Sequence, residues 1–386
     1  MSAVLAAARR TRRSTWAALS ILAVFCILVT TAAVRQSEIV DEGLFIAGGA
    51  VQVRHLDPNI DLTHPPLLRW VAGLPAVFFG GARVAEPPPI VPRGAMDLYA
   101  YKIQDVFNYT VPFFYDSGAS HDRVLFWGRA PFALLGALLA WLVFVCVRRL
   151  FGPWPALTAL AVCAFTPEIL AQSQWAHSDI ASALTLVLVS IALARVLQDA
   201  RARNFALLGG AMGLAIATKL TVLILWPPIL VLLPFFRRGS WKTLLKNAVL
   251  ALAVSFAAVV VSYLPKPRMF GHEFAASDLD RMGISSLAPV LRILPVPDSF
   301  LKGVFYTALI GQHGQIAFLH GRISTKGWWY YFPVAVFLKY PTGLLLIGLW
   351  GAWIFWRGRQ PLAVKVAATL PPAVIFAAAM AQSIDI

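Results

Sequence analysis

Two neighbouring acidic residues, Asp41 and Glu42, are the first candidates for chemistry in this sequence. They follow an apolar stretch that is long enough to cross a membrane, so their carboxylates would face the membrane surface. A carboxylate placed there can take a proton from a hydroxyl group. An isolated Asp-Glu pair is more often an ordinary solvated loop charge. The residues that follow this pair are what make it a candidate for chemistry.

His64 is the second candidate, in the segment Thr63-His64-Pro65-Pro66-Leu67. The prolines have a fixed φ and no N–H to satisfy, so they begin a helix cleanly. His64 would then lie at a helix N-terminus at headgroup depth, a place suited to a phosphate. An apolar-rich pattern over residues 43–53 predicts another helix between the acidic pair and this turn.

Two cations stand at the outer ends of apolar runs. Lys219 separates two such runs with almost no loop between them, and Arg129 lies near the start of another. A cation on that side of a membrane favours an anionic partner, and we predict that both bind phosphate. Snorkelling of the side chain to the headgroups is the alternative for either residue.

Asp179 opens a further apolar run, in His177-Ser178-Asp179. Ser178 or Asp179 would serve as the N-cap of that helix. An ionisable group close to the bilayer is costly unless it is paired, and such groups are functional candidates. The two interpretations are compatible.

An aromatic cluster ends the last long polar segment, over Gly327-Trp328-Trp329-Tyr330-Tyr331-Phe332-Pro333-Val334. His320, Arg322 and Lys326 precede it. Aromatic residues at an interface usually form a membrane belt. With cations beside them, Trp328, Trp329, Tyr330 and Tyr331 could instead line a groove for a lipid-linked sugar, because Arg binds phosphate with a fork of donors.

The composition identifies lipid as the main solvent of this chain. Of 386 residues, 59% are hydrophobic and 13% charged, against roughly 25% charged in soluble domains. The net charge of +15 comes from short basic clusters between apolar runs, which argues against nucleic acid as a partner. Cys26, Cys146 and Cys163 lie inside apolar runs and indicate neither a metal site nor disulfides. No motif for nucleotide binding, a Ser triad or zinc catalysis occurs.

The apolar runs predict an all-α polytopic membrane protein with about nine transmembrane helices. The first, about 15–34, is expected to be a retained helix rather than a signal peptide. The others are expected at about 126–147, 154–172, 180–197, 204–218, 220–236, 243–264, 331–356 and 362–381.

Arginine and lysine clusters give the orientation. An arginine-rich, cytoplasmic N-terminus satisfies the positive-inside rule at every later turn. Residues 35–125 and 265–330 then form two long extracytoplasmic loops. The apolar run 67–79 would invert the later turns if it crossed the membrane, so we expect an interfacial helix there.

Together these residues resemble the GT-C glycosyltransferases of the protein O-mannosyltransferase and aminoarabinose transferase superfamily, in particular its bacterial phospholipid-carrier-dependent members. The order and sidedness of the elements carry the resemblance through nearly the whole chain. The matching elements are Asp41-Glu42, His64 to Leu67, Arg129 to Pro131, Ser178-Asp179, Thr218-Lys219 and the segment from Gly327.

The resemblance implies inverting transfer of a sugar from a polyprenyl-phosphate donor to a hydroxyl acceptor at the outer face of the cytoplasmic membrane. It implies that Asp41 is the general base and that Glu42 supports it or positions the acceptor. Arg129, Lys219, His64 and Arg322 would balance charge on the departing phosphate. Asp179 would hold a divalent metal ion or orient one of these cations, and metal dependence stays open.

The sequence departs from the family pattern in two places. Relatives continue with further spans and a C-terminal outer region, where this chain ends at Ser383-Ile384-Asp385-Ile386. The stretch 312–326 is longer and more basic than in the family, which leaves the acceptor side of the site open.

Other functions stay possible. A transporter or flippase for a lipid-linked substrate would also need intramembrane cations and aromatic grooves, although no internal repeat supports it. An inactive or scaffolding fragment is a third possibility. The donor sugar and the acceptor, whether protein, lipid or glycan, are not specified by these residues.

Overall fold

The computed structural model describes residues 2–56, 61–84, 109–237, 239–265, 285–293, 295–313, 317–324 and 327–381. Of the segments named above, residues 57–60, 85–108, 266–284, 294, 314–316 and 325–326 of the two long loops lie outside this description, as do residues 383–386. The chain divides into two compact units. The first comprises Met1–Asp61 and Pro65–Val187, and the second comprises Leu62–His64 and Leu188–Ile386.

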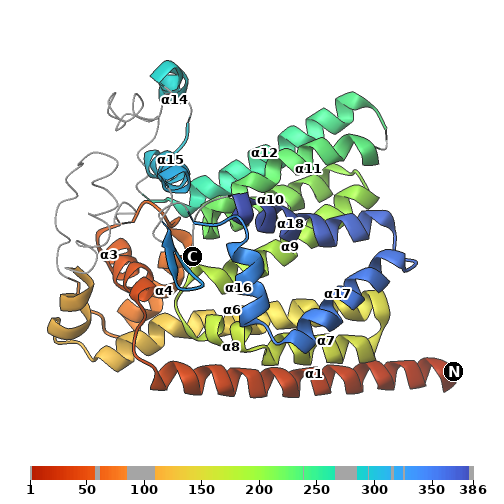
Figure 1. The fold of residues 1–386 in the computed structure, drawn as a ribbon, viewed down its shortest axis with the longest axis horizontal. Helices are drawn as coiled ribbons and strands as arrows, with labels where there is room; N and C mark the ends of the chain where they lie inside the picture. The colour runs from red at the N-terminus through yellow and green to blue at the C-terminus, as the bar shows by residue number, and fades with distance from the viewer. Residues whose placement is uncertain are drawn as a thin grey trace. The chain divides into compact units, whose positions relative to one another are not determined.

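The first unit is helical throughout its described elements. These are α1 (Ser2–Arg35), α2 (Val40–Glu42), the π-helical turn η1 (Gly43–Ala47), α3 (Gly48–His55), α4 (Leu67–Phe78), the π-helical turn η3 (Pro112–Asp116), α6 (His121–Phe151), α7 (Pro153–Phe165), α8 (Pro167–Gln174) and the first half of α9 (Ser178–Gln198). Helices α1, α6 and α7 lie side by side (Figure 1). Ala18, Phe144 and Leu160 are fully buried between them.

The second unit continues α9 into α10 (Ala202–Thr218), η4 (Leu220–Leu225), α11 (Trp226–Leu232), η5 (Leu233–Phe236) and α12 (Trp241–Ser262). Next come η6 (Ser285–Leu287), α14 (Ala288–Ile293), α15 (Asp298–His313), the strands β1 (Ala317–Leu319) and β2 (Arg322–Ser324), and then α16 (Tyr331–Lys339), α17 (Thr342–Arg357) and α18 (Leu362–Ala381). The strands form an antiparallel hairpin in which Phe318 pairs with Ile323. His320 and Gly321 have positive φ in its turn, as tight hairpins require.

The prediction of an all-α polytopic membrane protein is confirmed. Five described helices are long and apolar enough to cross a bilayer: α1 from Arg13, α6, α9, α12 and α18. The count rises to seven if each of two bent helix pairs is one span. Helix α10 has 17 residues, and the segment Leu220–Phe236 is also short, so the predicted number of about nine spans stays a prediction.

Proline divides two of the runs expected to be spans. The run 154–172 bends by 58° between α7 and α8, and the run 331–356 bends by 114° between α16 and α17. Thr166 and Tyr340, which precede Pro167 and Pro341, have extended backbones with ψ of 126° and 141°. A residue before proline avoids the helical region, so each helix ends there. Neither range forms a straight helix.

The helix expected over 67–79 is present as α4, with Pro66 at its N-cap. Its 12 residues extend roughly 18 Å, too short to cross a bilayer. Gly49 of α3 meets Gly73 of α4 so closely that a Cβ on Gly49 would lie 3.0 Å from the Gly73 Cα atom. The position of α4 along the membrane interface stays a prediction.

Small residues bring α10 and α12 together (Figure 1). Gly209 and Gly213, four residues apart on α10, face Ala251 and Ser255, four residues apart on α12. A Cβ on Gly213 would lie 2.5 Å from the Ser255 carbonyl oxygen. Such spacing allows backbones to approach closely, which is how helices associate where lipid removes the hydrophobic driving force.

This crossing predicts opposite effects for two neighbouring glycines. Gly209→Ala is expected to lower the unfolding midpoint in detergent, because its Cβ would overlap the Ala251 carbonyl. Gly210→Ala is the matched control: no atom lies within 4 Å of its added Cβ, and alanine favours a helix by about 1 kcal/mol over glycine. Equal midpoints for the two variants would show that the close crossing is wrong.

Candidate active site

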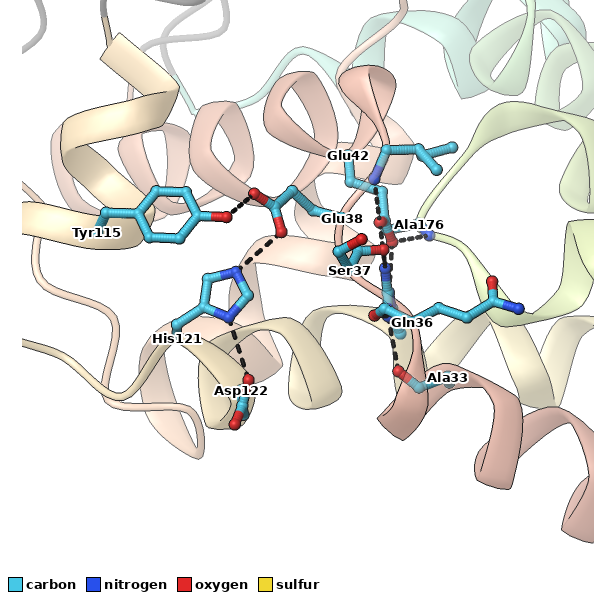
Figure 2. Close-up of polar contacts among 11 residues, drawn as sticks. Ala33, Gln36, Ser37, Glu38, Glu42, Tyr115, His121, Asp122 and Ala176 are labelled. Carbon is cyan, nitrogen blue, oxygen red and sulfur yellow. Dashed lines mark hydrogen bonds and ion pairs between the residues drawn. The ribbon is translucent and has the colours of Figure 1, made fainter.

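A buried ion pair between Glu42 and Arg129 lies at the centre of the first unit. The guanidinium meets the carboxylate as a fork, with Nε 2.7 Å from Oε1 and Nη2 2.6 Å from Oε2. The backbone N–H of Ala176 donates to Oε1 at 2.9 Å, and that of Ile39 donates to Oε2 at 3.0 Å. Figure 2 shows these bonds converging on Glu42. Each carboxylate oxygen thus accepts two hydrogen bonds.

The same arginine satisfies carbonyl groups at the end of α1. Nη1 donates to Ala33 O at 2.6 Å and to Gln36 O at 2.8 Å, and Nη2 donates to Ser37 O at 2.8 Å. The last carbonyls of a helix have no partner within it and favour a positive charge. With the two bonds to Glu42, all five N–H donors of a guanidinium are used.

Arg129 therefore joins four parts of the chain that are distant in sequence. It comes from α6, Glu42 from α2, the carbonyls from the end of α1, and the N–H of Ala176 from the segment before α9. Arg129 is 1% exposed and Glu42 is fully buried. A phosphate could bind this guanidinium only by displacing Glu42 or the carbonyls, so the geometry favours a structural role for Arg129 over the predicted phosphate contact.

Asp41 faces the other way from its neighbour. Successive helical residues point about 100° apart, so burial of Glu42 leaves the Asp41 side chain 45% exposed. Its Oδ2 lies 3.1 Å from Nε2 of His177, whose side chain is 14% exposed. The accessible acid of the pair is therefore the residue predicted to be the base.

The hydrogen bond at Nδ1 of His177 determines which nitrogen of the imidazole carries the proton. The backbone nitrogen of Asp179 lies 3.3 Å from Nδ1 and donates its N–H to it. In the neutral imidazole the proton is then on Nε2, which donates to Asp41. The Asp179 carboxylate lies 3.6 Å from Nδ1, close enough to pair with the ring if it takes a second proton. His177 thus links Asp41 and Asp179, although the sequence alone singles out only Asp179.

The turn after Asp41 and Glu42 is π-helical, over Gly43–Ala47. A Cβ on Gly43 would lie 2.6 Å from Cγ2 of Thr110, so glycine is needed for this contact. Short π-helical turns occur frequently at functional sites. Here the turn begins directly after the acidic pair.

A second group of polar residues, Glu38, Tyr115 and His121, lies beside the hydrogen bonds of Glu42 (Figure 2). Glu38 accepts hydrogen bonds from the Tyr115 hydroxyl and from Nε2 of His121, the latter at 3.0 Å. Burial alone would raise the pKa of the Glu38 carboxyl, but the bonds from Tyr115, its own N–H and His121 lower it below its usual value. The bond to Glu38 raises the pKa of the Tyr115 hydroxyl. These bonds connect η3 and the start of α6 to Glu38, in the segment that follows α1.

A buried arginine also fixes the turn before α4. Arg69 is fully buried; its Nε donates to Gln52 Oε1 at 2.9 Å and its Nη1 donates to Asp61 O at 2.6 Å. The Gln52 amide in turn donates to Pro66 O at 3.2 Å. Sequence reasoning identifies the proline turn but misses Arg69, because its partners lie 8 and 17 residues away.

The remaining predicted residues belong to the second unit. Nδ1 of His64 lies 3.2 Å from the Thr63 hydroxyl. Lys219 is half-buried and forms the single extended residue between α10 and η4, with φ −151° and ψ 120°. Its backbone N–H donates to Ala215 O and its carbonyl accepts from Val222 N. Lys219 thus occupies a fixed break between two apolar helices, as predicted.

Arg322 is exposed on β2, and the aromatic cluster follows the hairpin. Trp329 is 68% exposed and packs edge-on against Tyr330, with ring centroids 5.6 Å apart. Tyr331 begins α16 and meets Phe332 in the same way, while Trp328 is half-buried. The roles of these residues in binding a sugar or a phosphate stay predictions.

Within the described ranges, no group of three or more His, Cys, Asp or Glu side chains is arranged to hold a metal ion. Asp41, His177 and Asp179 lie close together at this site, but each imidazole nitrogen already faces a carboxylate. The two roles predicted for Asp179, holding a divalent metal ion or orienting one of the predicted phosphate-binding cations, stay predictions.

Two buried polar atoms beside the site have no hydrogen-bond partner in the part of the chain that the structure describes. They are Oε1 of Gln174 and Nε1 of Trp175. Both residues directly precede Ala176 and His177, which contact Glu42 and Asp41. Buried polar atoms normally have a partner, so this segment offers hydrogen bonds that a ligand or water would satisfy.

Part of this all-α polytopic membrane protein is similar to a known protein family. Residues 121–263 match the family described as dolichyl-phosphate-mannose-protein mannosyltransferase. This match supports the assignment of the chain to the GT-C superfamily and confirms the resemblance stated from the sequence. No curated protein and no solved structure shows a significant match to the chain.

The buried pair predicts a large loss of stability when one partner is removed. Arg129→Leu leaves the Glu42 carboxylate buried without its counter-charge, which is expected to cost roughly 3–5 kcal/mol. Thermal unfolding of the purified protein in detergent measures the effect. Arg123→Leu, in the first turn of the same helix, is the control, because Arg123 is exposed and donates only to the Phe79 carbonyl among the bonds described.

Replacing both partners tests whether the loss arises from the orphaned charge. The double variant Glu42→Leu with Arg129→Leu is expected to be more stable than Arg129→Leu alone, because no buried charge is left uncompensated. A double variant less stable than the single variant would contradict this interpretation.

Proposed function

We propose that this protein transfers a sugar, of the mannosyl type, from a polyprenyl-phosphate donor to a hydroxyl acceptor at the outer face of the membrane. The observation that carries the proposal is the position of Asp41: a half-exposed carboxylate held next to a fully buried ion pair, in a chain matching a mannosyltransferase family. The family description names a lipid-linked mannose as the donor of that family and protein as its acceptor.

In the proposed reaction, Asp41 accepts the proton of the acceptor hydroxyl. The hydroxyl oxygen forms a bond to the anomeric carbon as the bond from that carbon to the phosphate oxygen breaks. Polyprenyl phosphate leaves with the bonding electron pair, and direct displacement inverts the configuration. General base catalysis of this kind contributes roughly 100- to 10,000-fold.

His177 is proposed to orient this base. Its Nε2–H donates to Asp41 Oδ2 at 3.1 Å, and the backbone of Asp179 fixes the tautomer that makes the donation possible. Glu42 does not reach an acceptor from its buried position, which supports a role in holding Asp41 rather than in contacting substrate. Asp179 is proposed to act through this backbone N–H, which holds the ring in place.

Charge on the leaving phosphate needs cations other than the buried arginine. Lys219, His64 and Arg322 are proposed to balance this charge, and Trp328 to Tyr331 are proposed to form a wall for the sugar or lipid. Preorganised cations aimed at developing negative charge usually supply the largest share of catalysis. Of these three cations, Lys219 has the best structural support, because backbone hydrogen bonds on both sides fix its place between two apolar helices.

Asp41→Asn is expected to lower transfer by roughly 100- to 10,000-fold, because the amide keeps the shape and removes the base. The assay measures covalent transfer of label from polyprenyl-phosphate mannose to acceptor by the purified protein. Asp122→Asn is the control, since its side chain is 97% exposed and pairs only with His121 among the described residues. Transfer at the parental rate by Asp41→Asn would remove Asp41 from the mechanism.

His177→Ala is expected to lower the rate roughly 10- to 100-fold by misplacing the base. His177→Gln keeps an N–H donor and should recover part of the rate. An unchanged rate in His177→Ala would show that the imidazole does not act through Asp41.

The transporter alternative predicts a different product from the same experiment. A flippase would move labelled donor across the bilayer of proteoliposomes without forming a covalent product. The family match favours the transferase. Comparing mannose, another hexose and an amino sugar on the same carrier would identify the donor.

A further inference from the structure

A basic pocket lies in the second unit, where α9 turns into α10. It encloses about 470 Å³ and is lined by Arg195, Gln198, Asp199, Arg203, Asn204 and Leu207. None of these residues belongs to the proposed transfer site. Arg195 is in the last turn of α9, a helix long enough to span the bilayer, so the pocket lies where that span meets water.

The turn that carries the two arginines is held by hydrogen bonds on both sides. The Asn204 side chain donates to Asp199 O at 2.7 Å, and Asn247 of α12 donates to Ala200 O at 2.9 Å. Asp199 is engaged by Arg201, with Nε 3.4 Å from Oδ2. The one acid in the lining thus pairs with a residue outside it, and Arg195 and Arg203 give the lining two positive charges against one negative charge.

An apolar strip leads from the pocket along α10. Leu207 and Leu214 are 48% and 39% exposed and lie two turns apart on one face of the helix. Between them Gly210 has open space at the position of a side chain. The strip is thus a shallow apolar track that begins at a charged pocket at the end of a span. The pocket suits a phosphate headgroup, and the track suits an acyl chain attached to it.

We propose that this pocket binds the phosphate headgroup of an anionic phospholipid, with one acyl chain along Leu207, Gly210 and Leu214. Arginine binds phosphate with a fork of donors, and basic pockets between helices on the side with positive charge bind anionic lipid headgroups. The occupant is a structural lipid and not the sugar donor, so the inference does not depend on the proposed transfer reaction.

Lipid binding to the full-length protein is measured by native mass spectrometry from a neutral detergent. Phosphatidylglycerol is added to the parental protein and to Arg195→Gln with Arg203→Gln, and phosphatidylcholine is the uncharged comparison. The double variant is expected to lose at least about fivefold in phosphatidylglycerol affinity without a change for phosphatidylcholine. Arg237→Gln is the control, because Arg237 is an exposed arginine after η5 that does not line the pocket and does not pair with a lining residue in the part of the chain that the structure describes.

Two further measurements test the acyl track and the requirement for a whole lipid. Gly210→Leu fills the track without altering charge and should weaken the binding of long-chain phosphatidylglycerol without lowering the unfolding midpoint. Inorganic phosphate at the same concentration should not displace the lipid. Equal loss in Arg237→Gln, an unchanged affinity in the double variant, or displacement by inorganic phosphate would each overturn the proposal.

Discussion

The hydrogen-bonded pair of Glu42 and Arg129 is the constraint on which the first unit depends. Removing two charges from water is expensive, and an ion pair offsets that cost only when its geometry is good and its other hydrogen-bonding groups are satisfied. Here the guanidinium uses all five donors, and each carboxylate oxygen accepts two bonds. The pair fixes the end of α1, the short helix α2, the first turns of α6 and the segment before α9.

This constraint explains why two adjacent acids have different places. Glu42 is buried as the anchor, and helical geometry then turns Asp41 to the accessible side, next to His177. The Ala176 N–H bonds to Glu42 and the following residue bonds to Asp41, so the segment before α9 contacts both acids at once. A site built in this way positions the Asp41 carboxylate by backbone and buried charge rather than by flexible surface contacts.

Much of the helical architecture can be predicted, because apolar runs of sufficient length have few alternatives in lipid. The helix over 67–78 and the break at Lys219 both follow from local sequence. The bends before Pro167 and Pro341 carry a local signal as well, in the restriction that proline places on its preceding residue. The number of spans is harder to predict, because it depends on how short or bent helices are placed in the membrane.

The site is predictable only in part. Asp41 and Glu42 stand out as a pair, but sequence does not show which acid is buried when the partner is 87 residues away. Arg129 is recognisable as a cation needing an anion; the sequence points to a phosphate because it cannot place Glu42 beside the guanidinium. The sequence singles out Asp179 in the segment His177-Ser178-Asp179. The position of His177, two residues before that acid, is the signal that could have identified the histidine as well.

A double-mutant cycle on the transfer rate, combining Asp41→Asn with Arg129→Lys, decides whether the buried pair serves the base. If Arg129 acts by holding Glu42 and thereby placing Asp41, Arg129→Lys will slow the parental enzyme but cause no further loss once the Asp41 carboxylate is gone. If the two losses multiply, Arg129 acts on the reaction independently of Asp41, and the dependence of the base on the buried pair is contradicted.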